Sequence, residues 1–140
     1  MDRYELPASL SIAYGNIDAE HQGLVDTLNA ALRMSRSEPN APVNYFLPFL
    51  RNLRDGMKHH FLHEEQEMAK LGYPELAQHK LHHANCARRL EEIQAAIVAG
   101  EKTADKDLLD ELFDMILDDI IRADSGFKSF LHSRNLVAPG

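Results

Sequence analysis

Apolar residues recur every three or four positions in four stretches of this chain, and no stretch shows the sustained alternation of a β-strand. Such spacing places the apolar side chains along one face of a helix. The expected helices span residues 17–36, 42–71, 74–99 and 104–132, after an irregular N-terminal arm. Four amphipathic helices with short connections predict an all-α fold, an antiparallel up-down-up-down four-helix bundle. We expect residues 1–140 to form a single domain.

Glycine and proline mark the expected ends of the helices. Gly72 and Pro74 predict the end of one helix and the start of the next. Pro48 has two interpretations: it marks the true start of the second helix, or it kinks the first turns of a helix that starts earlier. Thr103 is expected to cap the fourth helix at its N-terminus.

Composition argues against several classes of protein. The formal net charge of −7 argues against nucleic acid and anionic membranes as partners, because both require a basic surface. No apolar run approaches the roughly 20 residues of a membrane-spanning helix, and the first residues do not begin a signal peptide. The single cysteine, Cys86, permits no internal disulfide and is interpreted as a small core thiol. A cytoplasmic monomer is expected.

Histidines and carboxylates occur at one-turn spacing along the expected helices. His60 and Glu64 are four residues apart, as are His79 and His83, so each pair projects from one side of a helix. Further candidates lie among the apolar side chains that form one face, or stripe, of the first and fourth helices: His21, Asp119 and Asp124. Buried groups of this kind are costly unless they have partners, and a metal satisfies several of them at once. The sequence therefore predicts a metal site in the core.

Each candidate also has an ordinary structural interpretation. A lone histidine on an apolar stripe, such as His21, is usually a hydrogen-bonded core residue, and His60 with Glu64 can form an exposed ion pair. The presence of candidates on every stripe favours the metal site. Glu65 and Glu67 are interpreted as surface charges. The other histidines fall off the stripes and are expected to be solvated or to support the ligands from outside: His59, His63, His82 and His132.

At these residues the chain resembles the hemerythrin family, over nearly its whole length. Residues 17–21 are similar to the first-helix signature of that family, an isoleucine–aspartate step followed three residues later by a ligand histidine. Residues 60–68, with a histidine–phenylalanine step, two glutamates and a methionine, match the second-helix pattern. Residues 73–83, with a tyrosine–proline step and two histidines, match the third. The resemblance implies a four-helix bundle that holds two irons and binds O2 reversibly without haem.

Carried over onto this chain, the ligand set of the family implies a di-iron centre. Two histidines would hold each iron: His21 and His60 the first, His79 and His83 the second. Glu64 and Asp124 would bridge the two irons, together with a solvent-derived oxo or hydroxo group. Histidine and carboxylate ligands also suit Mn and Zn, so neither metal is excluded.

The fourth helix departs from the family pattern. The family usually has a histidine five residues before the bridging aspartate and a tryptophan four residues before that histidine, where this chain has Asp119 and Met115. Asp119 would thus replace the third imidazole of the iron held by His79 and His83. On an ideal helix Asp119 and Asp124 lie about 140° apart. Because aspartate is shorter than histidine, we expect Asp119 to coordinate only through a water or if the helix moves inward.

These observations predict a non-haem di-iron protein that binds, stores or senses O2 or a related small ligand such as peroxide, and is not an enzyme. Phe61 and Ile116 are expected to line an apolar O2 pocket, with ordinary core packing as the alternative. A carboxylate at Asp119 favours ferric over ferrous iron. A di-iron oxidase, a peroxidase-like enzyme or a nitric-oxide-reactive enzyme, with an unknown electron donor, is therefore one alternative. A degraded site that acts as a sensor or interaction module is the other.

Overall fold

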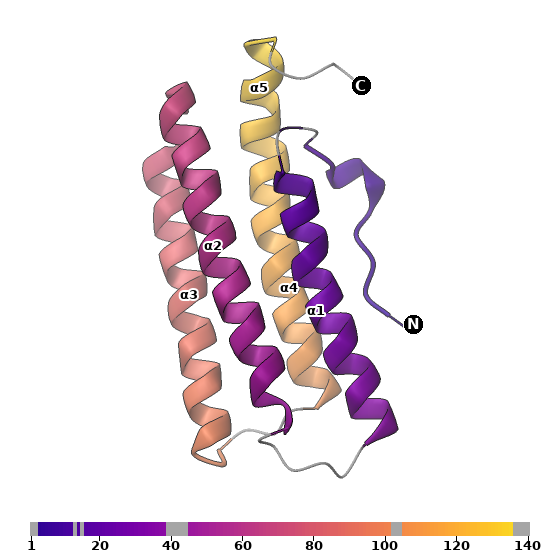
Figure 1. Ribbon diagram of the computed structural model, residues 1–140. Coiled ribbons are helices and arrows are strands. Elements are labelled where there is room, and N and C mark those ends of the chain that lie inside the picture. Colours follow the sequence, from indigo (N-terminus) through magenta and orange to yellow (C-terminus); the bar gives the residue numbers. More distant parts are fainter. Residues whose placement is uncertain (1–2, 13, 15, 39–44, 102–104, 136–140) are drawn as a thin grey trace.

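Four long helices form an antiparallel bundle in the part of the chain that the structure describes (Figure 1). The structure is a computed structural model that describes residues 3–12, 14, 16–38, 45–101 and 105–135, with the backbone alone for residues 123–125. Helix α1 packs against α2 and α4, and α2 packs against α3. No strand occurs among the described residues, so the expected fold class is confirmed. The long helices are α1 (Ile17–Ser37), α2 (Leu47–Leu71), α3 (Leu76–Val98) and α4 (Lys106–Arg122).

The helix ends follow the glycine and proline signals of the sequence. Helix α2 is capped at its C-terminal end by Gly72, whose φ of 71° lies in the left-handed region that favours glycine. Pro48 lies in the first turn of α2, so it marks the start of the helix and does not kink it. Helix α3 begins two residues after Pro74. Thr103 lies outside the described residues.

The fourth helix continues into two shorter helical segments instead of remaining one regular helix. The π-helical segment η3 (Ala123–Lys128) follows α4 directly, and α5 (Ser129–Ser133) extends it in the same direction (Figure 1). A Cβ atom on Gly126 would overlap the hydroxyl oxygen of Tyr73, so a larger residue at this position of η3 would force the Tyr73 side chain to move. The π-helical turn therefore packs closely against the turn between α2 and α3. Such turns change which side chains face inward along a helix.

The N-terminal arm is held against the bundle at two places. The backbone N–H of Tyr4 donates to Oδ1 of Asn29 at 2.6 Å, and the Tyr4 carbonyl accepts from Nδ2 of Asn29 at 2.9 Å. Farther along, Asp18 of α1 accepts hydrogen bonds from the Ser11 hydroxyl at 2.7 Å and from the Ile12 backbone N–H at 2.8 Å. The segment between these two anchors covers part of α1 and α4.

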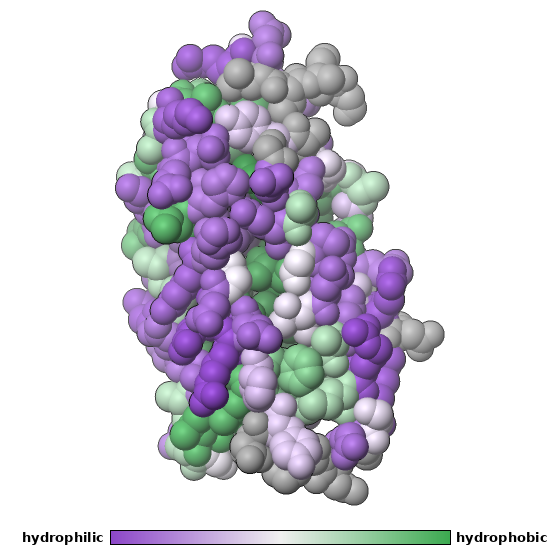
Figure 2. Space-filling view, viewed as in Figure 1, coloured by the Kyte–Doolittle hydropathy of each residue, from purple (hydrophilic) through white to green (hydrophobic). Residues whose placement is uncertain are grey.

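The hydrophobic core consists of two clusters with a layer of buried polar side chains between them. Along α2, Phe61 belongs to the larger cluster and Met68 to the smaller one, and the buried Glu64 lies between them. Along α1, Leu24 and Ile17 occupy the two clusters in the same way. The face shown in Figure 2 is covered mainly by hydrophilic residues, as expected for amphipathic helices that turn their apolar sides inward. In the described part of the chain, no helix is both long and apolar enough to cross a membrane.

Candidate metal centre

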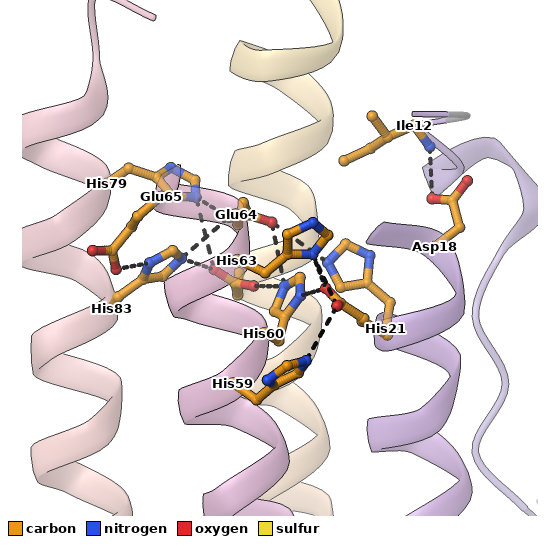
Figure 3. A network of polar contacts seen from close by, with 12 residues as sticks. Ile12, Asp18, His21, His59, His60, His63, Glu64, Glu65, His79 and His83 are labelled. Atoms are coloured by element: carbon orange, nitrogen blue, oxygen red, sulfur yellow. Dashed lines mark hydrogen bonds and ion pairs between the residues drawn. The ribbon is translucent and has the colours of Figure 1, made fainter. Parts of the chain in front are cut away.

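Six polar side chains from the four long helices meet in the layer between the two apolar clusters, and Figure 3 labels the five that come from α1, α2 and α3. Each of them exposes no more than 6 % of its surface. They are His21 of α1, His60 and Glu64 of α2, His79 and His83 of α3, and Asp119 of α4. The structure thus brings together six of the residues that the sequence singled out as candidate metal ligands.

Glu64 lies at the middle of this cluster. Its Oε1 lies 2.5 Å from Nε2 of His79 and 3.2 Å from Nε2 of His83. Its Oε2 lies 3.2 Å from Nε2 of His60 and 3.8 Å from Nε2 of His21. One oxygen therefore faces the two histidines of α3, and the other faces the histidines of α1 and α2. This is the arrangement that a carboxylate needs in order to bridge two cations.

Asp119 also reaches both halves of the cluster. Its Oδ1 lies 3.0 Å from Nε2 of His83, and its Oδ2 lies 3.4 Å from Nε2 of His60. The sequence places this residue only beside the histidines of α3, and its short side chain suggests that it needs a water or a helix shift to reach a metal. In the structure α4 packs close enough for direct contact. Asp119 is therefore a second carboxylate positioned between the two halves.

The six residues form two overlapping sets of possible ligands. His21 and His60 belong to one set, His79 and His83 belong to the other, and both sets share two carboxylates. Within each set the ligand atoms all lie within 4.8 Å of one another. Two ligands at about 2.1 Å from one metal lie roughly 3.0–3.5 Å apart, so modest side-chain adjustments would let each set hold one cation. The donor set, imidazole nitrogens with carboxylate oxygens, suits Fe, Mn and Zn.

Asp124, the remaining residue of the expected ligand set, lies in η3. Its side chain lies outside the described part of the structure. The bridging role that the family resemblance implies for Asp124 therefore stays a prediction. The π-helical turn that carries this residue begins directly after α4, one helical turn beyond Asp119.

Unpartnered atoms in the cluster support its ability to hold a cation. Among the described residues, three buried side-chain atoms make no hydrogen bond: Nε2 of His21, Nε2 of His60 and Oε2 of Glu64. All three face the same space, and leaving such atoms unpartnered is costly unless a cation binds them. Burial, and after it the nearby His60, lowers the pKa of His21. This favours the neutral imidazole, which is the form that binds metals.

Without a metal, ion pairs act across the whole cluster. Burial alone would raise the pKa of Glu64, but the imidazoles of His60, His79 and His83 beside it hold that pKa well below its ordinary value. Burial would also raise the pKa of Asp119, yet His60 and His83 lower it to about 2. Burial would lower the histidine pKa values, but the two carboxylates raise the pKa of His60 to about 10 and that of His83 to about 9. Metal binding must displace these protons.

Two glutamates outside the cluster hold the far nitrogens of its histidines. Nδ1 of His60 lies 2.9 Å from Oε1 of Glu20, and Nδ1 of His83 lies 2.7 Å from Oε2 of Glu65. In each pair the imidazole N–H donates to the carboxylate, which leaves Nε2 pointing into the cluster. Carboxylates in this position fix the orientation of metal-binding histidines and increase their basicity.

The interpretation of Glu65 as a surface charge was wrong, and sequence reasoning missed Glu20 altogether. Glu65 faces α3, and its side chain is only 22 % exposed because it packs against His83. The available signal was chemical: a histidine that binds metal through Nε2 needs an acceptor for its Nδ1–H. Candidate acceptors are carboxylates next to the ligand positions, and both Glu20 and Glu65 immediately neighbour such a position.

Replacing Glu65 with alanine is expected to weaken metal binding by roughly 10- to 100-fold, because His83 loses the acceptor that orients it. Competition with a chromophoric chelator measures the affinity. Glu65→Gln keeps an acceptor oxygen and should lose less, whereas Asp55→Ala, which removes a 69 % exposed carboxylate from the same helix, should bind metal like the native protein. An unchanged affinity in Glu65→Ala would contradict the orienting role.

Phe61 and Ile116 lie in the apolar cluster that borders the metal site. The Phe61 ring stacks on the His83 imidazole, with centroids 4.0 Å apart and planes 9° apart. Ile116 is fully enclosed in the same cluster. Phe61 therefore excludes water from one side of His83. The role of either residue in lining a ligand pocket stays a prediction.

Other polar groups near the cluster have different surroundings. His63 is partly buried, and its Nδ1 lies 2.9 Å from Oε2 of Glu20, whereas His59 is largely exposed. His82 is also partly buried, and its Nε2 lies 3.6 Å from Sγ of Cys86. Burial raises the pKa of the Cys86 thiol to about 11. Cys86 is thus a protonated thiol in the core and a poor metal ligand.

The amino-acid sequence matches the model of one known protein family. Residues 13–131 match the family model described as the hemerythrin HHE cation binding domain. No curated protein and no solved structure gives a significant match. The matched span includes every residue of the buried cluster, from His21 on α1 to Asp119 on α4. The chain therefore belongs to the hemerythrin HHE cation-binding family, and the matched domain contains a buried cluster of histidines and carboxylates that could hold metal ions.

Proposed function

We propose that this protein is a cytoplasmic, monomeric non-haem di-iron protein that binds O2 or a related small ligand at its buried cluster. The observation that supports this proposal is that the two sets of possible ligands share the carboxylates of Glu64 and Asp119. Shared carboxylates hold two cations close together, so that both can act on one small ligand. Two ferrous ions in such a centre would supply the electrons that make O2 a favourable ligand.

A pocket beside the cluster supports the proposal that the ligand is a small molecule. It has a volume of about 160 Å³ and lies between residues 6–11 of the arm, Ile120 of α4, and Asp18, His21 and Gln22 of α1. His21 is the residue of the cluster that borders this pocket. Because His21 borders this pocket and has an unpartnered Nε2, we infer that a small ligand approaches the centre from the side of His21. The size of the pocket favours diatomic molecules, peroxide or small organic compounds.

One observation favours oxidative chemistry as a second candidate function. Asp119 contacts both halves of the cluster, where a second shared carboxylate adds negative charge in a buried site. Negative charge stabilises ferric over ferrous iron, which shortens the lifetime of a reduced protein in air. An oxidase, a peroxidase-like enzyme or an oxidation sensor would use this property, whereas a reversible O2 carrier would not.

Metal analysis and exposure to air distinguish these functions. The protein is loaded anaerobically with Fe(II), its iron content per chain is measured, and optical spectra are followed after O2 is admitted. We expect two irons per chain and a spectral change that requires O2. Reversal of that change on removing O2 supports a carrier, and rapid, irreversible oxidation supports the oxidative function. A protein that holds fewer than two irons, or that does not respond to O2, contradicts the proposal.

Asp119→His tests the contribution of the carboxylate. Removing a negative charge from the cluster is expected to raise the reduction potential and to slow oxidation in air several-fold. Redox titration and stopped-flow spectroscopy measure the two effects. Asp118→His is the matched control, because this neighbouring aspartate is 54 % exposed and pairs with Arg122. Equal oxidation rates in the native protein and Asp119→His would show that Asp119 does not set the redox chemistry.

A further inference from the structure

Two histidines outside the buried cluster face one glutamate at the surface. His59 and His63 lie four residues apart on α2, so both project from the same side of that helix. Glu20 of α1 lies opposite them, where α1 packs on α2. Figure 3 shows both imidazoles beside the cluster, on the side of α2 that faces α1. Neither histidine belongs to the two ligand sets of the buried centre.

One oxygen of Glu20 lies between the two histidines. Oε2 of Glu20 lies 2.9 Å from Nδ1 of His63 and 3.8 Å from Nε2 of His59. Two ligands of a common metal lie roughly 3.0–3.5 Å apart, so His63 is close to the required separation from this oxygen, whereas the His59 imidazole would have to rotate inward to complete the set. The His59 side chain is 77 % exposed, so its imidazole has room to rotate toward the other two groups.

The surroundings leave space for an ion and add further oxygen atoms. A hollow of about 240 Å³ is lined by Asn16, Glu20, His59, Leu62, His63 and Gln66. Three of these side chains are the candidate ligands, and two are neutral amides with oxygen donors. In addition, Oε1 of Glu67 lies 3.8 Å from Nε2 of His63. An incoming cation therefore meets nitrogen and oxygen donors, and none of the residues lining the hollow is a lysine or an arginine.

We propose that His59, His63 and Glu20 form a surface site for one divalent transition-metal cation, separate from the buried centre. Two imidazoles and one carboxylate suit Zn²⁺ and the neighbouring borderline cations, with water completing the coordination. The site would load the centre, because Glu20 also contacts Nδ1 of His60, a member of the buried cluster. This loading role rests on the proposed two-metal centre, whereas the surface site itself does not.

Titration of the metal-free chain with Zn²⁺ tests the site. Isothermal titration calorimetry should show two Zn²⁺ ions binding at the buried centre and a third Zn²⁺ ion binding more weakly at the surface site. The double variant His59→Gln/His63→Gln should lose only the weaker equivalent, since glutamine keeps a donor toward Glu20 without an imidazole. His132→Gln, which removes a histidine elsewhere, should keep all equivalents. If the native chain binds no more Zn²⁺ ions than the double variant does, the proposal is overturned.

The same variants separate the surface site from the centre. If the centre takes up no Zn²⁺, the native chain still binds the single equivalent that the double variant loses. If the centre binds and the surface site does not exist, both proteins bind the same number of ions. For the loading role, Zn²⁺ uptake at limiting metal should be several-fold slower in the double variant, with equal final occupancy of the centre. Equal uptake rates would overturn that role.

Discussion

Loading the metal-free protein with two divalent cations is expected to raise its free energy of unfolding by about 5 kcal/mol, at free metal roughly a hundredfold above each dissociation constant. The reason is that the ligand atoms converge only in the folded bundle, where three of them are buried without a partner. Because the site exists only in the folded protein, the free energy of metal binding adds to the free energy of unfolding. Denaturant titrations of the metal-free and loaded forms measure the difference. Coinciding transitions would show that the cluster does not bind the cations.

The two forms should differ in how their stability depends on pH. In the metal-free fold, the pKa values of His60 and His83 are raised to about 10 and about 9. Their contribution to stability is complete below pH 6.5 and is lost as the pH rises through those values. The pKa of Asp119 is lowered to about 2, so its contribution is present above its ordinary value of 3.8 and is lost as the pH falls toward 2. The metal-free protein should therefore be most stable between these limits.

Above pH 6.5 the metal-free protein should lose up to about 1.4 kcal/mol per pH unit for each of these two histidines. Metal binding has the opposite dependence, because the cations bind neutral imidazoles and compete with protons at low pH. The stability difference between the loaded and metal-free forms should consequently grow from pH 6 to pH 9. Denaturant titrations at three pH values in this range provide the measurement. A difference that shrinks with rising pH would contradict the ion pairs described for the cluster.

Glu64→Ala is expected to abolish the binding of both cations. Glu64 is the residue whose two oxygens face all four histidines of the cluster, so its loss removes one ligand from each set and the negative charge between them. Metal content per chain, measured by elemental analysis after desalting, should fall from two ions to fewer than one. From the family resemblance alone, the same result is expected of Asp124→Ala.

Control variants separate loss of the site from loss of the fold. Asp55→Ala removes a 69 % exposed carboxylate from the same helix and should leave the metal content unchanged. Glu64→Gln keeps the size of the side chain and its ability to hydrogen-bond, and should still lose the cations because the bridging charge is gone. Circular dichroism verifies the helical content of each variant. A folded Glu64→Ala protein that retains two cations would refute the bridging role of Glu64.

The helices and most of the cluster were predictable from the sequence because both depend on short-range spacing. Residues four apart on a helix share a side, so the His79–His83 and His60–Glu64 patterns indicate which face of each helix carries the polar groups. The apolar residues around them indicate that the same face is buried. Turn signals such as Gly72 then mark where one helix ends and its neighbour begins. Together these local rules place the polar groups in one layer of the bundle.

Contacts between helices were not predictable in this way. The reach of Asp119 to both His60 and His83 depends on how closely α4 packs, a distance that helical spacing does not contain. The same applies to Glu65, which was interpreted as a surface charge, and to Glu20, which sequence reasoning did not single out; both carboxylates pair across helices with cluster histidines. In each case the rotation and axial offset of two packed helices select the partner.

Local spacing therefore established the bundle, the buried polar layer and the residues that fill it, since each of these follows from the period of a single helix. The tertiary structure established which atoms meet: the two carboxylates between both halves, the acceptors behind the histidines, and the pocket between the arm and His21. These features join residues far apart in the chain, and their geometry depends on the packing of every helix at once. The metal-binding capacity of the cluster depends on distances of this kind, which the period of a single helix does not contain.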